Sequence, residues 1–336
     1  DASAMAGTFG ALAFGLQHYR PGMPWAGVLA NRVASERHAD MLQISVREPA
    51  QWLGALMRNP ALSLPERHLG LTVASEVVDA MARLDAAADA LAVTPLGQMT
   101  LADLQRWSVS FSAPDDAVGS AIASQPLAGR TVAVARDAAF CFIYQANLYC
   151  LQALGADLVF FSPLADAALP ECDAVWLPGG YPELHAARLG ANTGLRDSLK
   201  AHVARHQPVW AECGGMMVLF DTLVTMDGHH EPQWGLLPGT VTVQKRLAAL
   251  GPQQWRTPQG VLRGHTFHYS TCTTDLPAQD RTARPDQAPS PEAGEAVYQC
   301  GSIRASYFHA WFGSSPGATA SLLGANLMGS RHVRTL

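Results

Sequence analysis

V-W-A-E-C-G-G-M-M, residues 209–217, is the stretch that predicts the fold around it. Apolar residues run into a cysteine, two glycines follow, and apolar residues resume. This pattern predicts a short buried strand ending at Cys213, a Gly-Gly turn and a helix that begins near Met216. The cysteine would then lie on a sharp strand-to-helix turn, with the first N–H groups of the helix pointing toward it. Because a helix N-terminus favours negative charge, we expect a stabilised, nucleophilic thiolate there. The alternative is an ordinary buried structural cysteine.

The composition is that of an ordinary globular protein. The chain has 336 residues, which suggests two domains, with 48% hydrophobic and 15% charged residues. A formal net charge of −5 without a long basic run argues against nucleic acid or an anionic membrane as the main partner. No apolar run approaches the roughly 20 residues of a membrane helix. The six cysteines form no C-x-x-C pair, so we expect reduced thiols in the cytoplasm and no metal site.

Residues 1 to about 112 alternate between helical and strand-like patterns, which is typical of a parallel α/β domain. The small, polar, Pro- and Gly-containing residues 113–129 predict a linker, and residues 130–336 a second α/β domain. The chain starts without Met in a segment that resembles the interior of a domain, so we expect a fragment. In the first domain the patterns predict helices over 8–17, 37–46 and up to about 92, and strands over 25–33 and 52–57.

The second domain is expected to place its glycines and Cys213 at one edge of a sheet. The patterns predict strands over 131–136, 157–164, 173–180 and 208–213, helices over 147–155 and 194–206, and a β-rich region beyond about 235. Ligand sites of open α/β sheets lie at the carboxyl ends of the strands. Gly179, Gly180 and Cys213 all fall at such ends, so they could share one crevice.

A cysteine nucleophile needs a base, which is usually a histidine. His309 lies near the end of a late strand, and His265 and His268 share another. His265 and His268 are three residues apart and so face opposite sides of a strand, which argues against a shared metal. From the residues alone, His309 and His265 are equal candidates. The turn at 177–183 can aim backbone N–H groups into the crevice and, with the N–H of Gly214, form an oxyanion hole. The alternative is a plain turn.

Longer strings carry a resemblance that spans nearly the whole chain. The second domain, with a strand ending in P-G-G, then A-E-C-G-G and S-Y-x-H, resembles the class I glutamine amidotransferases, which have a flavodoxin-like fold. The chain as a whole resembles the cobyrinic acid a,c-diamide synthases, including the hydrogenobyrinic acid form. The first domain resembles the second half of that family's P-loop, dethiobiotin synthetase-like ATP-binding amidoligase domain. The strings are 134–144, 161–170, 179–185, 211–217 and 263–270, with G-V-L-A-N-R-V and P-E-R-H-L-G-L in the first domain.

The resemblance implies roles for particular residues. Cys213 is the expected glutaminase nucleophile and His309 its base, in preference to His265, which the family pattern places in a different, structural or interdomain strand. The N–H groups of Gly180 and Gly214 are expected to hold the oxyanion. Asn31 matches an adenine-contacting position, although a strand-capping turn residue is an equal interpretation. The resemblance identifies no carboxylate partner for the base.

It further implies that glutamine supplies ammonia, and that ATP with Mg²⁺ activates the a and c acetates of a corrinoid. Thr266 stands where the family usually has Glu, and Trp311 where it usually has a second His. A P-loop G-x-x-x-x-G-K-[S/T] occurs nowhere in the sequence. We therefore expect glutamine cleavage at best, because the part that binds the ATP phosphates would precede Asp1.

Alternatives remain open at this point. The chain could be another tetrapyrrole amidase, of the cobyric acid synthase or nickel-sirohydrochlorin a,c-diamide synthase type. It could be a non-catalytic binding module that keeps the amidotransferase fold, or a cysteine peptidase of related fold. A homodimer is also left open.

Overall fold

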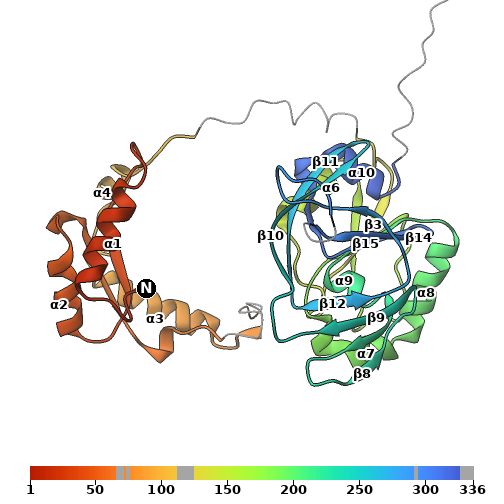
Figure 1. Cartoon of the computed structure of the whole chain (residues 1–336), viewed down its shortest axis with the longest axis horizontal. Coiled ribbons are helices and arrows are strands. Elements are labelled where there is room, and N and C mark those ends of the chain that lie inside the picture. Colours follow the sequence, from red (N-terminus) through yellow and green to blue (C-terminus); the bar gives the residue numbers. More distant parts are fainter. Residues whose placement is uncertain (66–71, 73–75, 112–124, 291–293, 326–336) are drawn as a thin grey trace, which may run out of the picture. The chain divides into compact units, whose positions relative to one another are not determined.

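The computed structural model describes residues 1–65, 72, 76–111, 125–290 and 294–325. The chain divides into two compact units, Asp1–Pro114 and Asp115–Leu336, drawn from red to orange and from yellow to blue in Figure 1. Most of the predicted linker at 113–129, and most of the string P-E-R-H-L-G-L at 65–71, lies outside the described residues.

The first unit is a small α/β arrangement. Strands β1 (Val28–Val33) and β2 (Trp52–Met57) pair in parallel, and their inner side chains form a core with helix residues such as Phe9 and Leu42. The expected helices and strands of this region are confirmed to within a few residues at their ends. Its helices are α1 (Gly7–His18), α2 (Glu36–Ser45), α3 (Ala80–Ala92) and α4 (Leu101–Gln105), with short 3-10 turns at Pro49–Gln51 and Pro60–Leu62.

The second unit is built on a seven-stranded sheet with the strand order β13-β14-β15-β6-β5-β3-β4. The five strands from β15 to β4 run parallel, and β13 and β14 add an antiparallel edge. The four predicted strands and two predicted helices are confirmed. The strands are β3 (Thr131–Ala135), β4 (Asp157–Phe161), β5 (Ala174–Leu177), β6 (Val209–Glu212), β13 (Ala278–Arg281), β14 (Ala296–Cys300) and β15 (Ile303–Ser306). The helices are α6 (Gln145–Ala153), α7 (Ala186–Ala191), α8 (Thr193–Ala204), α9 (Gly214–Met217) and α10 (Pro316–Leu322).

Successive residues of the central strands enter two different cores. Ala133 and Ala135 of β3 lie in one cluster, and Val132 and Val134 lie in the other, because side chains alternate across a strand. Both faces of the sheet are covered, which explains the nearly continuous apolar runs of these strands.

The β-rich region after residue 235 is confirmed: three of its strands, β13, β14 and β15, join the main sheet, and the others, together with β7 and β8, form two smaller sheets (Figure 1). In the sheet β10-β11-β16, strand β16 lies at the edge and begins with His309. The other sheet has the order β12-β9-β7-β8. The strands are β7 (Phe220–Val224), β8 (His230–Pro232), β9 (Leu237–Val243), β10 (Ala249–Thr257), β11 (Gly260–His268), β12 (Ser270–Thr273) and β16 (His309–Trp311).

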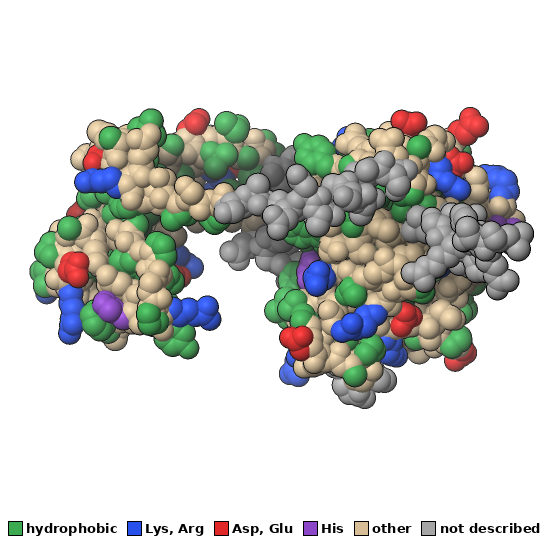
Figure 2. Space-filling view, turned by 90° about the horizontal axis from the view of Figure 1, so that it is seen from above, with side chains coloured by type: hydrophobic (Ala, Val, Ile, Leu, Met, Phe, Trp, Pro, Cys, Tyr) green, Lys and Arg blue, Asp and Glu red, His purple; other side chains and the backbone are tan. Residues whose placement is uncertain are grey.

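Acidic and basic side chains are interspersed over the face shown in Figure 2, in keeping with the small net charge of −5. None of the helices in the described part of the chain has the length and apolar character needed to cross a bilayer.

Candidate active site

The predicted strand-to-helix elbow is present at Cys213. Strand β6 ends at Glu212, α9 begins at Gly214, and Cys213 between them has φ 45° and ψ −106°. A positive φ is unfavourable for a residue with a side chain and is often found at functional sites. The neighbouring strand holds the strained residue, because the N–H of Cys213 donates to the carbonyl oxygen of Ser306 at 2.8 Å. The helix has only four residues and starts two residues earlier than expected.

The two glycines after Cys213 are required by close packing. A Cβ on Gly215 would lie 2.2 Å from the carbonyl oxygen of Leu177, at the end of β5. A Cβ on Gly214 would lie 2.9 Å from the backbone nitrogen of Gly180. The structure therefore brings the Gly180 turn against the elbow, as the shared strand edge predicted.

The expectation of a stabilised thiolate is wrong for this conformation. The Cys213 side chain is buried, with 6% of its surface exposed. Burial raises the pKa of the thiol far above its ordinary value, and the negative charge of Glu183 adds to the rise. The N–H of Gly214 does point at the sulfur and lowers the pKa, but it does not overcome burial. The thiol is therefore neutral at pH 7 until a base removes its proton.

His309 is buried beside the same glycine turn. Its ring covers Gly179 so closely that a Cβ on this glycine would lie 2.4 Å from the His309 Cε1 atom. Burial, with smaller contributions from the nearby His265 and His268, lowers the pKa of His309 to about 3. The imidazole is therefore neutral and able to accept a proton. Within the described residues, no hydrogen bond joins His309 to Cys213, so the pair is not pre-formed. Such bonds are often long before substrate binds.

The rival histidine also belongs to this site. His265 of β11 lies directly opposite His309 of β16, and the two rings stack at 4.9 Å with an angle of 13°. The resemblance placed His265 in a structural or interdomain strand, but the structure places it against the candidate base. A pocket of about 580 Å³ opens beside the two rings, and Tyr144, Arg263 and the half-exposed Trp311 also line it. Trp311, one of the departures from the family pattern, therefore faces the space beside the base.

His268 is the satisfied structural histidine of the pair 265/268. Its Nδ1 is 2.7 Å from the carbonyl oxygen of Ser270, and its Nε2 is 3.1 Å from a carboxylate oxygen of Glu295. Thr266, the other departure from the family pattern, donates to the same carboxylate at 2.7 Å. These two donors hold the pKa of Glu295 below its ordinary value in spite of burial. Among the described residues, no group of three or more His, Cys, Asp or Glu side chains is placed to hold a metal ion.

Asn31 lies in the first unit, on β1, with an exposed side chain. Its Oδ1 accepts the N–H of Arg32 at 2.8 Å, and Arg32 has φ 62°. This contact supports the interpretation of Asn31 as a turn residue, while adenine contact stays a prediction.

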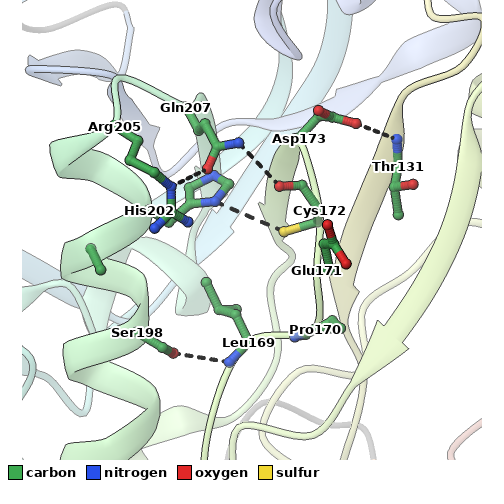
Figure 3. Close-up of a pocket in the computed structure, with 11 residues that line it drawn as sticks. Thr131, Leu169, Pro170, Glu171, Cys172, Asp173, Ser198, His202, Arg205 and Gln207 are labelled. Atoms are coloured by element: carbon green, nitrogen blue, oxygen red, sulfur yellow. Dashed lines mark hydrogen bonds between the residues drawn. The ribbon is translucent and has the colours of Figure 1, made fainter.

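A second pocket, of about 620 Å³, lies at the opposite edge of the main sheet, near the start of β3 (Figure 3). It contains a cysteine and a histidine, with Cys172 Sγ 3.9 Å from His202 Nδ1. Its polar groups mainly serve one another: Gln207 donates to the Cys172 carbonyl oxygen at 3.3 Å and accepts from Arg205 at 3.2 Å. Burial raises the pKa of Cys172 to about 11. The hydrogen bonds in this pocket hold the loop before β5 against α8. We therefore take the Cys213 site, and not this pocket, as the candidate active site.

Comparison with known proteins finds one matching domain and several relatives that match almost the whole chain. Residues 131–317 match the CobB/CobQ-like glutamine amidotransferase domain. The hydrogenobyrinate a,c-diamide synthase of Stutzerimonas stutzeri is 48% identical over 96% of this chain and 72% of that protein. The enzyme of that name from Pseudomonas aeruginosa is 46% identical over 96% of this chain and 71% of its own length. The cobyrinate a,c-diamide synthase of Herminiimonas arsenicoxydans is 44% identical, with 96% and 70% covered. The chain therefore belongs to the family of the cobyrinate and hydrogenobyrinate a,c-diamide synthases.

Proposed function

We propose that this chain hydrolyses glutamine with Cys213 as nucleophile and His309 as base, and that the ammonia amidates the a and c acetates of cobyrinic or hydrogenobyrinic acid. One observation carries the proposal: a cysteine held at positive φ lies at the sheet edge against the Gly180 turn, and a buried neutral imidazole covers the same turn. Family membership supports the corrinoid substrate, because the relatives are hydrogenobyrinate and cobyrinate a,c-diamide synthases.

The protonation states favour general-base catalysis over a resting ion pair. As the Cys213 sulfur attacks the side-chain amide carbon of glutamine, its proton passes to the neutral His309. The N–H groups of Gly180 and Gly214 hold the oxygen that becomes negative. The protonated His309 then gives its proton to the departing nitrogen, the carbon–nitrogen bond breaks, and ammonia leaves a thioester. Water, deprotonated by His309, hydrolyses the thioester to glutamate and restores the thiol.

ATP and Mg²⁺ are implied by the family for activating the corrinoid carboxylates, but the described residues of the first unit do not fit them. The described residues offer no cluster of acidic groups for a metal, and the sequence has no P-loop motif. We therefore propose ATP-dependent amidation as the family reaction and assign no phosphoryl-transfer step to these residues. That the first unit belongs to a P-loop amidoligase domain also stays a proposal.

Hydrolysis of glutamine by the purified chain tests the first half of the proposal. We expect glutamate formation that is lost in Cys213→Ala and falls to a small residual rate in His309→Ala. Cys172→Ala is the matched control, because this cysteine lies at the opposite edge of the sheet, and it should retain activity. If Cys213→Ala hydrolyses glutamine as fast as the unchanged chain, the proposed nucleophile is wrong. A chain with no glutaminase activity but retained ligand binding would be a binding module, and peptide cleavage without glutamine preference would indicate a peptidase.

The identity of the acceptor requires the amidated product. When the protein is supplied with ATP, Mg²⁺, glutamine and the corrinoid, mass spectrometry should find carboxamides at the a and c acetates. Carboxamides at other positions, or on a nickel-containing tetrapyrrole, would instead assign the cobyric acid synthase or nickel-sirohydrochlorin type. No disulfide joins any of the six cysteines, which supports our proposal of a reducing, cytoplasmic location. A homodimer stays a prediction.

A further inference from the structure

We propose that Glu212, the residue before the candidate nucleophile, is a positioning residue that holds the strand of the candidate base, His309, in place. The inference rests on the proposed function, since it concerns the alignment of the same pair. It also supplies a carboxyl group for this site, which neither the motif nor the resemblance identified.

Glu212 is buried on the face of the sheet that is rich in tryptophan. Side chains alternate along β6, so Trp210 and Glu212 point to one face, while Ala211 points into the other core. Glu212 is 2% exposed. A buried carboxyl group is costly unless it is hydrogen-bonded, so its partners matter.

Its partners join the two halves of the candidate pair. One carboxyl oxygen of Glu212 accepts from the indole N–H of Trp210 at 2.7 Å and from the backbone N–H of Ala310 at 3.3 Å. Glu212 is covalently bonded to Cys213, and Ala310 to His309. The hydrogen bond therefore links the neighbour of the nucleophile directly to the neighbour of the base, across 98 residues of sequence.

A second buried side chain, that of Asn147, also forms hydrogen bonds with the backbone at β16. Asn147 of α6, which is 1% exposed, donates to the carbonyl oxygen of Ala310 at 2.8 Å and accepts the N–H of Phe312 at 2.9 Å. Strand β16 has only three residues and lies at the edge of its sheet, where β11 is its neighbour on one side. On the other side, Glu212 and Asn147 take the place of a strand.

Glu212 acts here as a hydrogen-bond acceptor and not as a negative charge. Burial raises the pKa of Glu212 to about 8, although the Trp210 and Ala310 donors oppose the rise, so the group is largely neutral at pH 7. A glutamine at this position can offer the same oxygen to the same donors. An aspartate keeps the acid but is shorter by one methylene group and withdraws the oxygen from Ala310.

The test compares Glu212→Gln, Glu212→Asp and Glu212→Leu in the glutaminase assay of the full chain. We expect Glu212→Gln to keep most of kcat. Glu212→Leu should lower kcat by about 100-fold, with little change in KM for glutamine, because a displacement of about 1 Å at a reacting group has an effect of this order. Glu212→Asp should fall between them. Gln233→Leu is the control for a merely structural loss, since Gln233 is buried and donates to the Ala186 carbonyl oxygen at 3.0 Å. It should lower Tm and leave kcat unchanged.

A double-mutant cycle with His309→Ala shows whether Glu212 acts through the base. Glu212→Leu should reduce the residual turnover of His309→Ala far less than it reduces the turnover of the unchanged chain. An equal reduction in both backgrounds overturns the inference. If Glu212→Leu does not fold, the other two variants decide, because Glu212→Asp being more active than Glu212→Gln would show that the charge matters and not the acceptor. Hydrolysis that survives Cys213→Ala refutes the proposed function itself. Cys213-dependent hydrolysis that is unchanged in Glu212→Asp refutes only the role of Glu212.

Discussion

Replacing Gly179 by alanine should displace His309 and little else. The added Cβ would lie 2.4 Å from Cε1 and 3.2 Å from Nδ1 of the imidazole, while the next atom, Cδ2 of Phe142, is at an ordinary contact distance of 3.4 Å. Gly179 does not have a positive φ, so its backbone accepts alanine. The strain in this variant therefore comes from a single contact with the proposed base.

The size of the effect follows from this geometry. To reach an ordinary contact of 3.4 Å, the Cβ and the ring must move apart by about 1 Å. The ring has little room, because it is 4% exposed and stacks on His265 at 4.9 Å. Misplacement of a catalytic group by about 1 Å costs about 100-fold in rate, so we expect that loss in kcat. Overpacking should also lower the free energy of unfolding by about 1–3 kcal/mol.

The assay is glutamine hydrolysis, with urea unfolding followed in parallel. Gly15→Ala is the matched control, because its Cβ would meet no atom within 4 Å. It should leave kcat unchanged. In a His309→Ala background the clash disappears, so the second alanine should cost little further stability. Wild-type kcat in Gly179→Ala, or the same loss of stability with and without the imidazole, would refute the placement of His309 as the base.

Three further predictions follow from burial and hydrogen bonding. The pKa of His309 is about 3 in the folded chain and about 6.5 when unfolded, so the unfolded chain binds more protons between these values and acid lowers stability. His309→Gln should therefore lose less urea resistance than the unchanged chain between pH 7 and pH 5, and equal losses would contradict the shift. Because burial raises the pKa of Cys213, its alkylation by iodoacetamide, followed by mass spectrometry, should still be accelerating above about pH 10, whereas a plateau by about pH 10 would indicate an ordinary thiol with a pKa of about 8.5. Thr266→Val removes the 2.7 Å hydrogen bond to Glu295 with little change of shape. It should lower the free energy of unfolding by about 1–2 kcal/mol in urea titrations, and an unchanged value would show that the bond contributes nothing.

The local sequence pattern was sufficient to predict the main strands and helices and the sharp turn at Cys213. The apolar runs of β3, β5 and β6 predict strands buried on both faces, and the glycines that follow β5 and β6 predict tight turns at one edge. Gly179, Gly180 and Cys213 could be grouped for this reason, since the carboxyl ends of parallel strands meet. The base could not be chosen from the residues, because His309 and His265 both lie on late strands and the structure stacks one on the other.

The sequence by itself determined the α/β architecture, the sharp turn that places a cysteine between a strand and a pair of glycines, and a family signature along most of the chain. Only the tertiary structure decided that the Cys213 thiol is neutral, that His265 packs on His309, and that Glu212 binds the residue after the base. These features depend on burial and on contacts between segments about 40 to 100 residues apart. Local periodicity carries no information about which distant side chains exclude water from one another.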